Sequence, residues 1–425
     1  MGIHPRDGVS RKSRRTTLAG LLAVAVLGAQ PYDLVLQGGH VIDPKNQIDG
    51  VRDVAIAGGK IARIAERIPA SEARQRINVQ GLYVTPGLID MHVHVYLITG
   101  QKGLVGEVSV LPDAFSFRSG VTTMVDAGTA GWRNFGDFRQ RIIDRARTRV
   151  LAFLNIGGVG MSSEGENDVR DMDPEQAART ARAHRDVIVG FKVAHYDKDE
   201  WPDVDNALAA GRATGLPVMV DFGWTGQQRT LETLLTGKLR PGDIYTHCYS
   251  GHRAELLADN RLNPAMWEGR KRGILFDVGH GAASFYWNIA VPAVEQGFYP
   301  DVISTDLHGG SMNAGMKDML NVMSKMLALG IPLADVIRMS TWAPAQAIRR
   351  PELGHLDPGA VADVAVLRLE RGSFGFLDAA GARHPGDRRL VAELTIRGGS
   401  IVWDLNGLAA ADWKTFPYRP RQRPK

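Results

Sequence analysis

Two histidines stand one residue apart at the end of an apolar run, in the segment LIDMHVH at residues 88–94. Alternate side chains of a β-strand point to the same side, so a strand here would direct the imidazoles of His92 and His94 to one place. Converging imidazoles are good ligands for a divalent metal. Taken alone, the pair also fits two surface histidines beside a loop, so the rest of the chain has to distinguish these interpretations.

Several later apolar runs also end in polar residues. Lys192 in VGFKV is unfavourable as a buried ammonium unless it is paired, and Asp221 or Asp306 could be its partner. A neutral lysine can instead take up carbon dioxide and become a carbamate, an anionic group whose two oxygens can bridge two metals. The other polar residues in these runs are Asp221 in VMVDFG, His247 in THCY, His280 in DVGHG, and Asp306 and His308 in STDLHG.

Asp306 has both a structural and a chemical interpretation. Its carboxylate could accept hydrogen bonds from the amides of its own loop. A carboxylate that faces a metal-bound water is also suited to act as a general base, and two neighbouring metals can activate a hydroxide and polarise a carbonyl. The second interpretation predicts hydrolysis by a metal-bound hydroxide with Asp306 as the base.

The elements that would position these residues recur with a regular pattern. Eight short apolar runs begin near residues 88, 122, 149, 187, 217, 243, 273 and 301, and stretches such as 174–185, 201–215 and 314–330 have helical apolar spacing. Eight strands alternating with helices are typical of a (β/α)₈ TIM barrel, an α/β fold whose chemistry lies at the carboxyl ends of the strands. We therefore expect a metal-dependent hydrolase barrel over residues 86–350.

The segments on either side of the predicted barrel are rich in short strands. Residues 30–85 contain alternating apolar runs with expected turns at Gly38-Gly39 and Gly58-Gly59. Residues 351–412 contain a similar strand-like pattern. These two segments are expected to join into one small β-sandwich domain built from both ends of the chain.

The two ends of the chain differ from its body. Residues 1–29 contain the basic segment RKSRR and a 14-residue apolar run from Thr16 to Ala29 that ends in small residues. This run is too short to span a bilayer, and the arrangement predicts a signal peptide, with SRRTTL similar to a twin-arginine signal. The expected location is therefore the periplasm or exterior of a bacterium, with no stable membrane anchor. Residues 413–425 form a basic tail.

Composition excludes some other classes. The two ends carry more positive charge than the formal net +5 of the whole chain, which leaves the body net negative and without a basic surface for nucleic acid. The single cysteine, Cys248, excludes an intramolecular disulfide. The expected partner is a small-molecule amide substrate, and homo-oligomer formation stays open.

Several of these segments together resemble the amidohydrolase superfamily. GLIDMHVH is similar to its first-strand motif and PELGHLDPGAVADVAVL at 351–367 to its closing motif, while GVTTMVDAG, FDVGHGAASF, STDLHGG and STWAPAQAI resemble the amidohydrolase/deacetylase, or dihydroorotase-like, branch. The resemblance implies that His92, His94 and Asp306 bind one metal, that carboxylated Lys192 bridges, and that His247 binds a second metal. The family usually has a histidine where this chain has Asp221, whose carboxylate can still bind Zn²⁺ or Mn²⁺.

The expected substrate class follows from the differences between this chain and two groups of the superfamily, the dihydroorotases and the single-metal deaminases. Dihydroorotase usually has an arginine where this chain has Tyr96, and the single-metal deaminases of the superfamily do not use a bridging lysine. We therefore expect cleavage of an amide C–N bond, in an N-acyl amino acid or a cyclic amide. The alternatives are a dihydroorotase-like cyclic amidase or esterase, and a catalytically inactive metal-binding relative.

Three further residues are candidates for substrate contact. His280 and His308 could contact the substrate or its developing oxyanion, or could make only structural hydrogen bonds. Trp224 could form a wall of the pocket or pack on the barrel rim. The remaining histidines, His195 among them, carry no prediction beyond a structural role.

Overall fold

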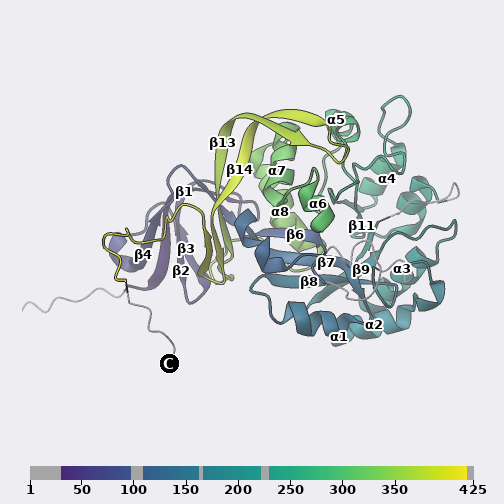
Figure 1. The fold of residues 1–425 in the computed structure, drawn as a ribbon, viewed down its shortest axis with the longest axis horizontal. Coiled ribbons are helices and arrows are strands. Elements are labelled where there is room, and N and C mark those ends of the chain that lie inside the picture. Colours follow the sequence, from purple (N-terminus) through teal and green to yellow (C-terminus); the bar gives the residue numbers. More distant parts are fainter. Residues whose placement is uncertain (1–29, 97–108, 162–165, 222–228, 419–425) are drawn as a thin grey trace, which may run out of the picture.

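The computed structural model describes residues 30–96, 109–161, 166–221 and 229–418, and its strands belong to two sheets. One sheet contains strands from both ends of the chain, and the other contains strands from the middle only. Figure 1 shows the two sheets beside each other, with most of the helices around the second.

The terminal strands pair into one eight-stranded sheet in the order β15-β14-β13-β5-β1-β2-β3, with β4 paired to β1. Its contacts between Val84 of β5 and Val366 of β13 join the two ends of the chain, as predicted. The pairing describes a single sheet, so a sandwich of two sheets is not confirmed. The strands are β1 (Tyr32–Asp43), β2 (Ile48–Ala57), β3 (Lys60–Ala65), β4 (Ala73–Asn78), β5 (Tyr83–Pro86), β13 (Val364–Leu377), β14 (Arg383–Arg397) and β15 (Ser400–Asp404).

Two glycine pairs of this sheet have different roles. Gly58 and Gly59 have positive φ and form the two-residue turn between β2 and β3, as expected. Gly38 and Gly39 do not form a turn, which corrects the prediction. They lie inside β1, where the register with β2 shifts, and a Cβ on Gly39 would lie 2.5 Å from Val84 Cγ2. The glycines therefore make a β-bulge under a close neighbour.

The middle of the chain forms a curled parallel sheet of seven strands, arranged in chain order. An eighth segment, residues 302–307, lies between its two edges through the bridges Asp277↔Val302 and Val93↔Leu307. This arrangement is compatible with a TIM-barrel-like domain, and each strand begins within two residues of its predicted start. The strands are β6 (Leu88–Val93), β7 (Val121–Gly131), β8 (Arg149–Asn155), β9 (Ile188–Val193), β10 (Val218–Val220), β11 (Ile244–Tyr245) and β12 (Leu275–Phe276).

Helices follow most of these strands. Asp173 caps the first long helix by accepting hydrogen bonds from the amides of Glu175 and Gln176, and that helix buries Ala177, Ala178 and Ala181. No helix among the described residues combines the length and the apolar character needed to cross a membrane. The helices are α1 (Phe135–Phe138), α2 (Pro174–Ala183), α3 (Pro202–Thr214), α4 (Pro264–Lys271), α5 (Trp287–Glu295), α6 (Gly309–Asn313), α7 (Met319–Ala328), α8 (Leu333–Ser340) and α9 (Trp342–Ala347).

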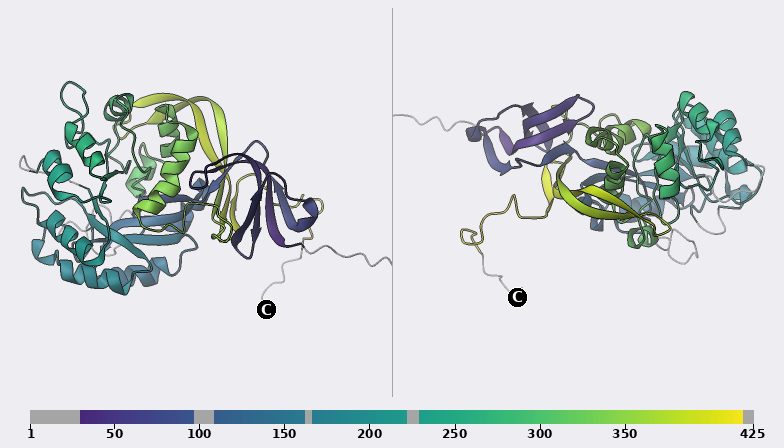
Figure 2. Two further views of the ribbon diagram at one scale, coloured as in Figure 1. Left: turned by 180° about the vertical axis from the view of Figure 1, so that it is seen from behind. Right: turned by 90° about the horizontal axis from the view of Figure 1, so that it is seen from above.

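The long hairpin of β13 and β14 connects the two parts of the molecule. It leaves the terminal sheet, crosses α7 and reaches α5, which both views in Figure 2 allow the reader to follow. The Leu390 amide of β14 donates to Ser324 Oγ of α7 at 3.0 Å. At the tip, Asp378 Oδ2 accepts from the Trp287 amide at 3.2 Å, and the indole Nε1 of Trp287 donates to the Phe376 carbonyl at 3.1 Å.

The predicted end regions lie mostly outside the described residues. Residues 1–29, the predicted signal peptide, and residues 419–425 of the predicted basic tail are not among them. The described part of that tail, residues 413–418, is exposed throughout.

Candidate active site

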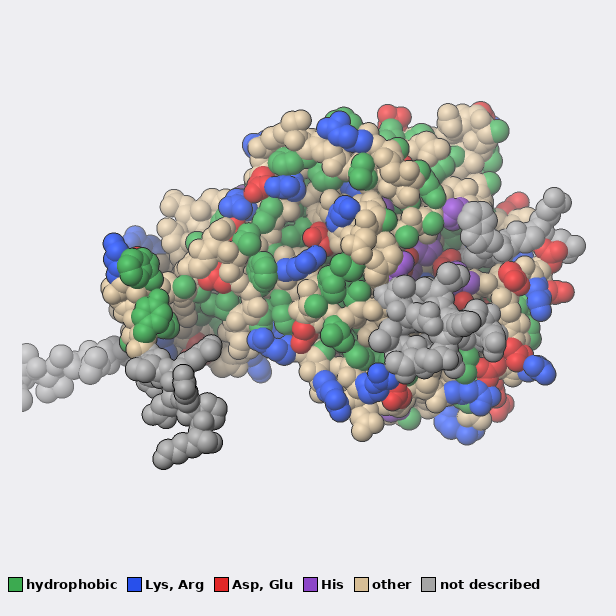
Figure 3. All heavy atoms as spheres, in the orientation of Figure 1, with side chains coloured by type: hydrophobic (Ala, Val, Ile, Leu, Met, Phe, Trp, Pro, Cys, Tyr) green, Lys and Arg blue, Asp and Glu red, His purple; other side chains and the backbone are tan. Residues whose placement is uncertain are grey.

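The predicted polar residues converge at one end of the parallel sheet. Parallel strands run in one direction, so their carboxyl ends share an edge. Residues at or just beyond the ends of β6, β9, β10 and β11 lie there together with segment 302–307. Histidine side chains are visible in a hollow of the surface in Figure 3. The predicted residues that contact one another at this edge are His92, His94, Lys192, Asp221, His247 and Asp306.

His92, His94 and Asp306 form a compact group of potential metal ligands. Asp306 Oδ1 lies 3.0 Å from His94 Nε2 and 3.7 Å from His92 Nε2. One nitrogen or oxygen from each residue falls within 4.8 Å of the others. Two imidazoles and a carboxylate at this spacing are a donor set that suits Zn²⁺ or a similar divalent ion.

The predicted histidine ligands share one orientation. In each of them Nδ1 contacts a protein oxygen, which directs Nε2 into the site, as is usual for histidines that bind metals. None of these oxygens was identified from the sequence. The contacts are His92 Nδ1 with Thr246 Oγ1 (3.0 Å), His94 Nδ1 with Thr129 Oγ1 (2.8 Å) and His247 Nδ1 with the Gly279 carbonyl (2.5 Å).

Lys192 is fully buried among these groups. Its Nζ contacts His92 Nε2 at 3.2 Å and Met219 Sδ at 3.7 Å, and neither contact is with a carboxylate. Burial lowers the pKa of Lys192, although the charges of Asp221 and Asp306 oppose that shift. Gly128 of β7 provides the room for this side chain, because a Cβ there would lie 2.6 Å from Lys192 Cβ. The site therefore makes the amine of Lys192 easier to deprotonate than that of an exposed lysine.

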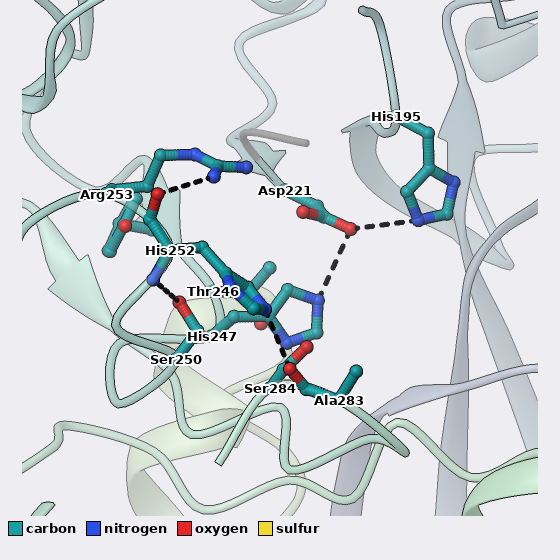
Figure 4. Close-up of a pocket in the computed structure, with 10 residues that line it drawn as sticks. His195, Asp221, Thr246, His247, Ser250, His252, Arg253, Ala283 and Ser284 are labelled. Carbon is teal, nitrogen blue, oxygen red and sulfur yellow. Dashed lines mark hydrogen bonds and ion pairs between the residues drawn. The ribbon is translucent and has the colours of Figure 1, made fainter. Parts of the chain in front are cut away.

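Asp221 lies between two imidazoles, as Figure 4 shows. Its Oδ2 is 3.3 Å from His247 Nε2 and 3.4 Å from His195 Nε2. Burial by itself would raise the pKa of Asp221, but the neighbouring His247, His195 and Lys192 outweigh burial and hold that pKa well below its usual range. Asp221 is therefore an ionised group that faces the site.

His195 was not identified as a site residue from the sequence. It stands three residues after Lys192, just beyond the end of β9, and this proximity was the available signal. Its backbone adopts a left-handed conformation with φ 55°, as do His247 (φ 63°) and Asp306 (φ 51°). Left-handed conformations in residues other than glycine are uncommon and often occur at functional sites.

Asp306 is ionised in this environment. Burial would raise its pKa, but His92, the hydrogen bond with His94, and His308 outweigh burial and lower the pKa far below the ordinary value. His92 and His94 would be metal ligands, so a bound cation would favour the carboxylate further. Asp306 is thus suited to bind a metal and to accept a proton only transiently.

The three predicted substrate-contact residues have different positions. His308 lines the site, with its ring centroid 6.2 Å from that of His94, and its Nδ1 also accepts from the Gly310 amide at 3.1 Å as the cap of α6. His280 faces away: its Nε2 lies 2.6 Å from Lys325 Nζ and its ring stacks on Phe285 at 4.7 Å. The structure therefore does not bring His280 into the cavity. Trp224 lies outside the described residues.

Two cavities meet at this site. One, of about 160 Å³, contains the His92, His94 and Asp306 group. The other, of about 130 Å³, extends toward Ser250, His252 and Arg253, which were not identified from the sequence. The walls that both cavities share are formed by His195, Asp221, His247, Ala283 and Ser284.

The known proteins that are similar to this chain in sequence include amidohydrolases and deacetylases. A family model described as the amidohydrolase family matches residues 287–386. A deacetylase of Agrobacterium fabrum is 35% identical over 327 residues, which cover 75% of this chain and 78% of that protein. A deacetylase of Brucella anthropi is 33% identical over 331 residues, which cover 76% of this chain and 80% of that protein.

Solved structures agree with these relatives. The crystal structure of an adenine deaminase has a TM-score of 0.78 and 26% identity, covering 88% of this chain and 100% of that one. The crystal structure of a dihydroorotase has a TM-score of 0.76 and 29% identity, covering 87% of this chain and 99% of that one. With the convergent histidines, lysine and aspartates already described, these matches show that the chain belongs to the amidohydrolase family and is a hydrolase that acts on carbon–nitrogen bonds.

Proposed function

We propose that this chain hydrolyses the amide bond of a small N-acyl amino acid with the help of two divalent metals. The observation that carries this proposal is the convergence of ionised carboxylates and oriented imidazoles around a buried lysine at the end of the parallel sheet. The proposed metal ligands are His92, His94, Lys192, Asp221, His247 and Asp306.

His92, His94 and Asp306 form a donor group for one metal, and Asp221 and His247 are the proposed additional donors for a second. Mixed imidazole and carboxylate donors suit Zn²⁺, and Mn²⁺ is an alternative. The surroundings of Lys192 support the carbamate, because neither described contact of its buried amine is with a carboxylate, and a carbamate there would offer two oxygens to bound cations. Bound metals would supply an activated water and polarise the scissile carbonyl.

The protein residues around the metals would hold the reactants and move the proton. Asp306 is ionised and exposed to the cavity, so it can take a proton from the attacking water and pass it to the departing nitrogen. His308 lines the same cavity and is held by the Gly310 amide, which places it to contact the substrate.

The second cavity supports a substrate with a free carboxylate. Figure 4 shows Arg253 and His252 on the opposite side of this cavity from His195. A guanidinium binds carboxylates in a fixed two-point geometry. An N-acyl amino acid would thus place its amide in the metal cavity and its carboxylate toward Arg253.

Tyr96 supports an acyl amino acid over dihydroorotate. In dihydroorotase-like enzymes an arginine at this position is expected to hold the substrate, whereas Tyr96 is buried and its hydroxyl donates to Asp137 Oδ2 at 2.7 Å. The similarity to a dihydroorotase of Anaeromyxobacter sp. covers 31% of this chain, against 75% for the deacetylase of Agrobacterium fabrum.

The test is a metal count on purified protein followed by matched substrates. We expect two metals per chain and hydrolysis of an N-acetyl amino acid, with a higher KM for the same compound as its C-terminal carboxamide. Arg253→Met should raise KM for the acid roughly 10–100-fold, as expected for a charged hydrogen bond, and leave the carboxamide nearly unchanged. Arg261→Met, an exposed arginine paired with Asp259, is the control.

Two outcomes would contradict this assignment. Equal kinetics for the acid and the carboxamide would exclude the carboxylate subsite. Turnover of cyclic amides alone would favour a cyclic amidase.

We also propose that the protein is exported to the periplasm or exterior of a bacterium. The support is the basic and apolar sequence of residues 1–29. N-terminal sequencing of the native protein should find a start near Gln30. A native protein that begins at Met1 or Gly2 in a cytoplasmic fraction would refute export.

A further inference from the structure

We propose that His195 is a ligand of the second metal and supplies the imidazole that Asp221 has displaced from the fifth strand. This inference rests on the proposed two-metal function. It concerns a residue that neither the sequence motifs nor the family pattern identifies.

The position of His195 places its ring nitrogen at the second site. Its Nε2 lies 3.4 Å from Asp221 Oδ2, and His247 Nε2 lies 3.3 Å from the same oxygen. His195 also forms part of the wall of both cavities. Asp221 Oδ2 therefore lies between the Nε2 atoms of two imidazoles, and its neighbour Lys192 is buried beside it.

The orientation of His195 matches that of the predicted ligands. Its Nδ1 lies 3.2 Å from both carboxylate oxygens of Glu166, while Nε2 faces the site. In His92, His94 and His247 the Nδ1 atoms likewise contact a protein oxygen and the Nε2 atoms face inward. A carboxylate that holds the outer nitrogen of a histidine is a common support for metal binding.

The backbone conformation of His195 indicates that contacts on both sides of its ring maintain its position. Strand β9 ends at Val193, and a left-handed residue at His195 (φ 55°) returns the side chain toward the site. For a residue with a Cβ this conformation is unfavourable, and it persists where surrounding contacts require it. Here Glu166 and Asp221 provide contacts on both sides of the ring.

The competing explanation is purely structural. A protonated His195 could hold the carboxylates of Glu166 and Asp221 together without touching a metal. Metal content and the Co²⁺ spectrum together distinguish the two explanations. Removal of a ligand changes the donor set of the second metal while the group of His92, His94 and Asp306 stays filled, whereas removal of a residue that only orients ligands lowers the affinity of the second metal and leaves its spectrum unchanged.

The experiment measures metal per chain and the affinity of the second metal, using Zn²⁺ for the count and the visible spectrum of Co²⁺ for the ligand environment. Wild type should bind two metals. His195→Ala should retain about one, and Glu166→Gln should weaken the second metal roughly 10–100-fold, as for other residues that orient ligands. The double variant His195→Ala with Asp221→His should recover two metals, since imidazole then returns from the fifth strand.

His40→Ala is the matched control. His40 has the same side-chain exposure as His195, 39%, and also pairs with a carboxylate, that of Asp49, but it lies in the terminal sheet. It should leave both metals in place.

The outcomes separate this inference from the proposed function. Two metals bound with unchanged affinity in His195→Ala would overturn the ligand role and leave the proposed function intact. Loss of both metals in His195→Ala would also overturn it, because the first group does not include His195. A wild type that binds at most one metal would overturn both the inference and the two-metal function.

Discussion

Lys192 and Asp306 are the residues on which the proposed chemistry depends most. Burial disfavours the charged form of both residues, but it prevails only at Lys192, whereas at Asp306 the neighbouring imidazoles outweigh it. Burial favours the neutral amine of Lys192, whereas the nearby imidazoles keep Asp306 ionised. One residue is thus suited to carry an added anionic group and the other to accept a proton.

Lys192→Ala should lose most metal and most activity, because it removes the proposed bridge and leaves a cavity beside Gly128. A short-chain carboxylic acid added to the variant should restore part of both by replacing the two oxygens of the bridge. Metal analysis and turnover, each with and without added acid, check this expectation. Near-normal turnover in Lys192→Ala would exclude the bridging role.

Asp306→Asn should reduce turnover on amides by roughly 10²–10⁴-fold, because the amide side chain cannot carry the proton to the leaving nitrogen. The loss on an activated ester of the same acyl group should be smaller, since that leaving group needs no proton. Initial rates on both substrates must be compared at matched metal content, because Asp306 is also a proposed ligand. Equal losses on both substrates would show that another group carries the proton.

At the scale of elements, α7 holds the loop behind the site. Lys325 of α7 is fully buried, and its Nζ donates to His280 Nε2 at 2.6 Å and to the Gly315 carbonyl at 2.8 Å. His280 Nδ1 contacts the Gly281 carbonyl at 2.9 Å, and a Cβ on Gly281 would lie 2.4 Å from Asp306 Oδ2. The helix therefore supports the segment against which Asp306 packs, so His280 has a structural position although it was predicted to contact substrate.

Lys325 should make the stability of the protein depend on pH. Burial lowers its pKa from 10.5 to about 7, so between these values the unfolded chain binds a proton that the folded protein has released. Stability should therefore rise with pH across this window, by at most about 1.4 kcal/mol per pH unit. In Lys325→Met this contribution should be absent.

Urea unfolding of wild type and Lys325→Met at pH 7.5 and 9.5 measures the difference. Lys271→Met, at an exposed lysine of α4, is the control and should keep the wild-type dependence. If Lys325→Met and wild type have the same pH slope, Lys325 remains charged in the folded protein.

At the scale of the whole molecule, the β13–β14 hairpin couples the terminal sheet to the parallel sheet. Asp378 organises its tip: Oδ1 accepts from the amides of Ala380 and Ala382 at 2.9 and 2.8 Å, and Oδ2 accepts from the Trp287 amide. Because one buried carboxylate holds both the turn and its contact with α5, the two parts of the molecule should unfold together.

Asp378→Ala should therefore lower the free energy of unfolding by about 2–3 kcal/mol, since it leaves several amide donors without their charged acceptor. Denaturant unfolding followed by fluorescence and circular dichroism checks the size of this loss and whether the two signals still coincide. Asp387→Ala, at an exposed aspartate of the same hairpin, should change stability by less than about 0.5 kcal/mol. Similar effects of the two substitutions would show that the tip does not couple the two sheets.

The sequence by itself determined the order of the parallel strands and the residues at their ends. Apolar runs and alternation are local properties, and parallel strands place their carboxyl ends together, so Lys192, Asp221, His247 and Asp306 could be predicted to converge before any distance was known. The pairing of the two terminal segments in one domain could be predicted in the same way, from the strand-like alternation of apolar residues in both segments.

Only the tertiary structure decided what surrounds those residues. The contacts of Thr129, Thr246 and Glu166 with the imidazoles join segments far apart in the sequence, and no local pattern specifies such pairs. The backbone turn that brings His195 to Asp221, and the stacking and Lys325 contact that take His280 away from the cavity, depend on packing between elements. Spacing along the chain predicts which residues reach the edge of a sheet, whereas the direction of each side chain there depends on the neighbours that the whole fold provides.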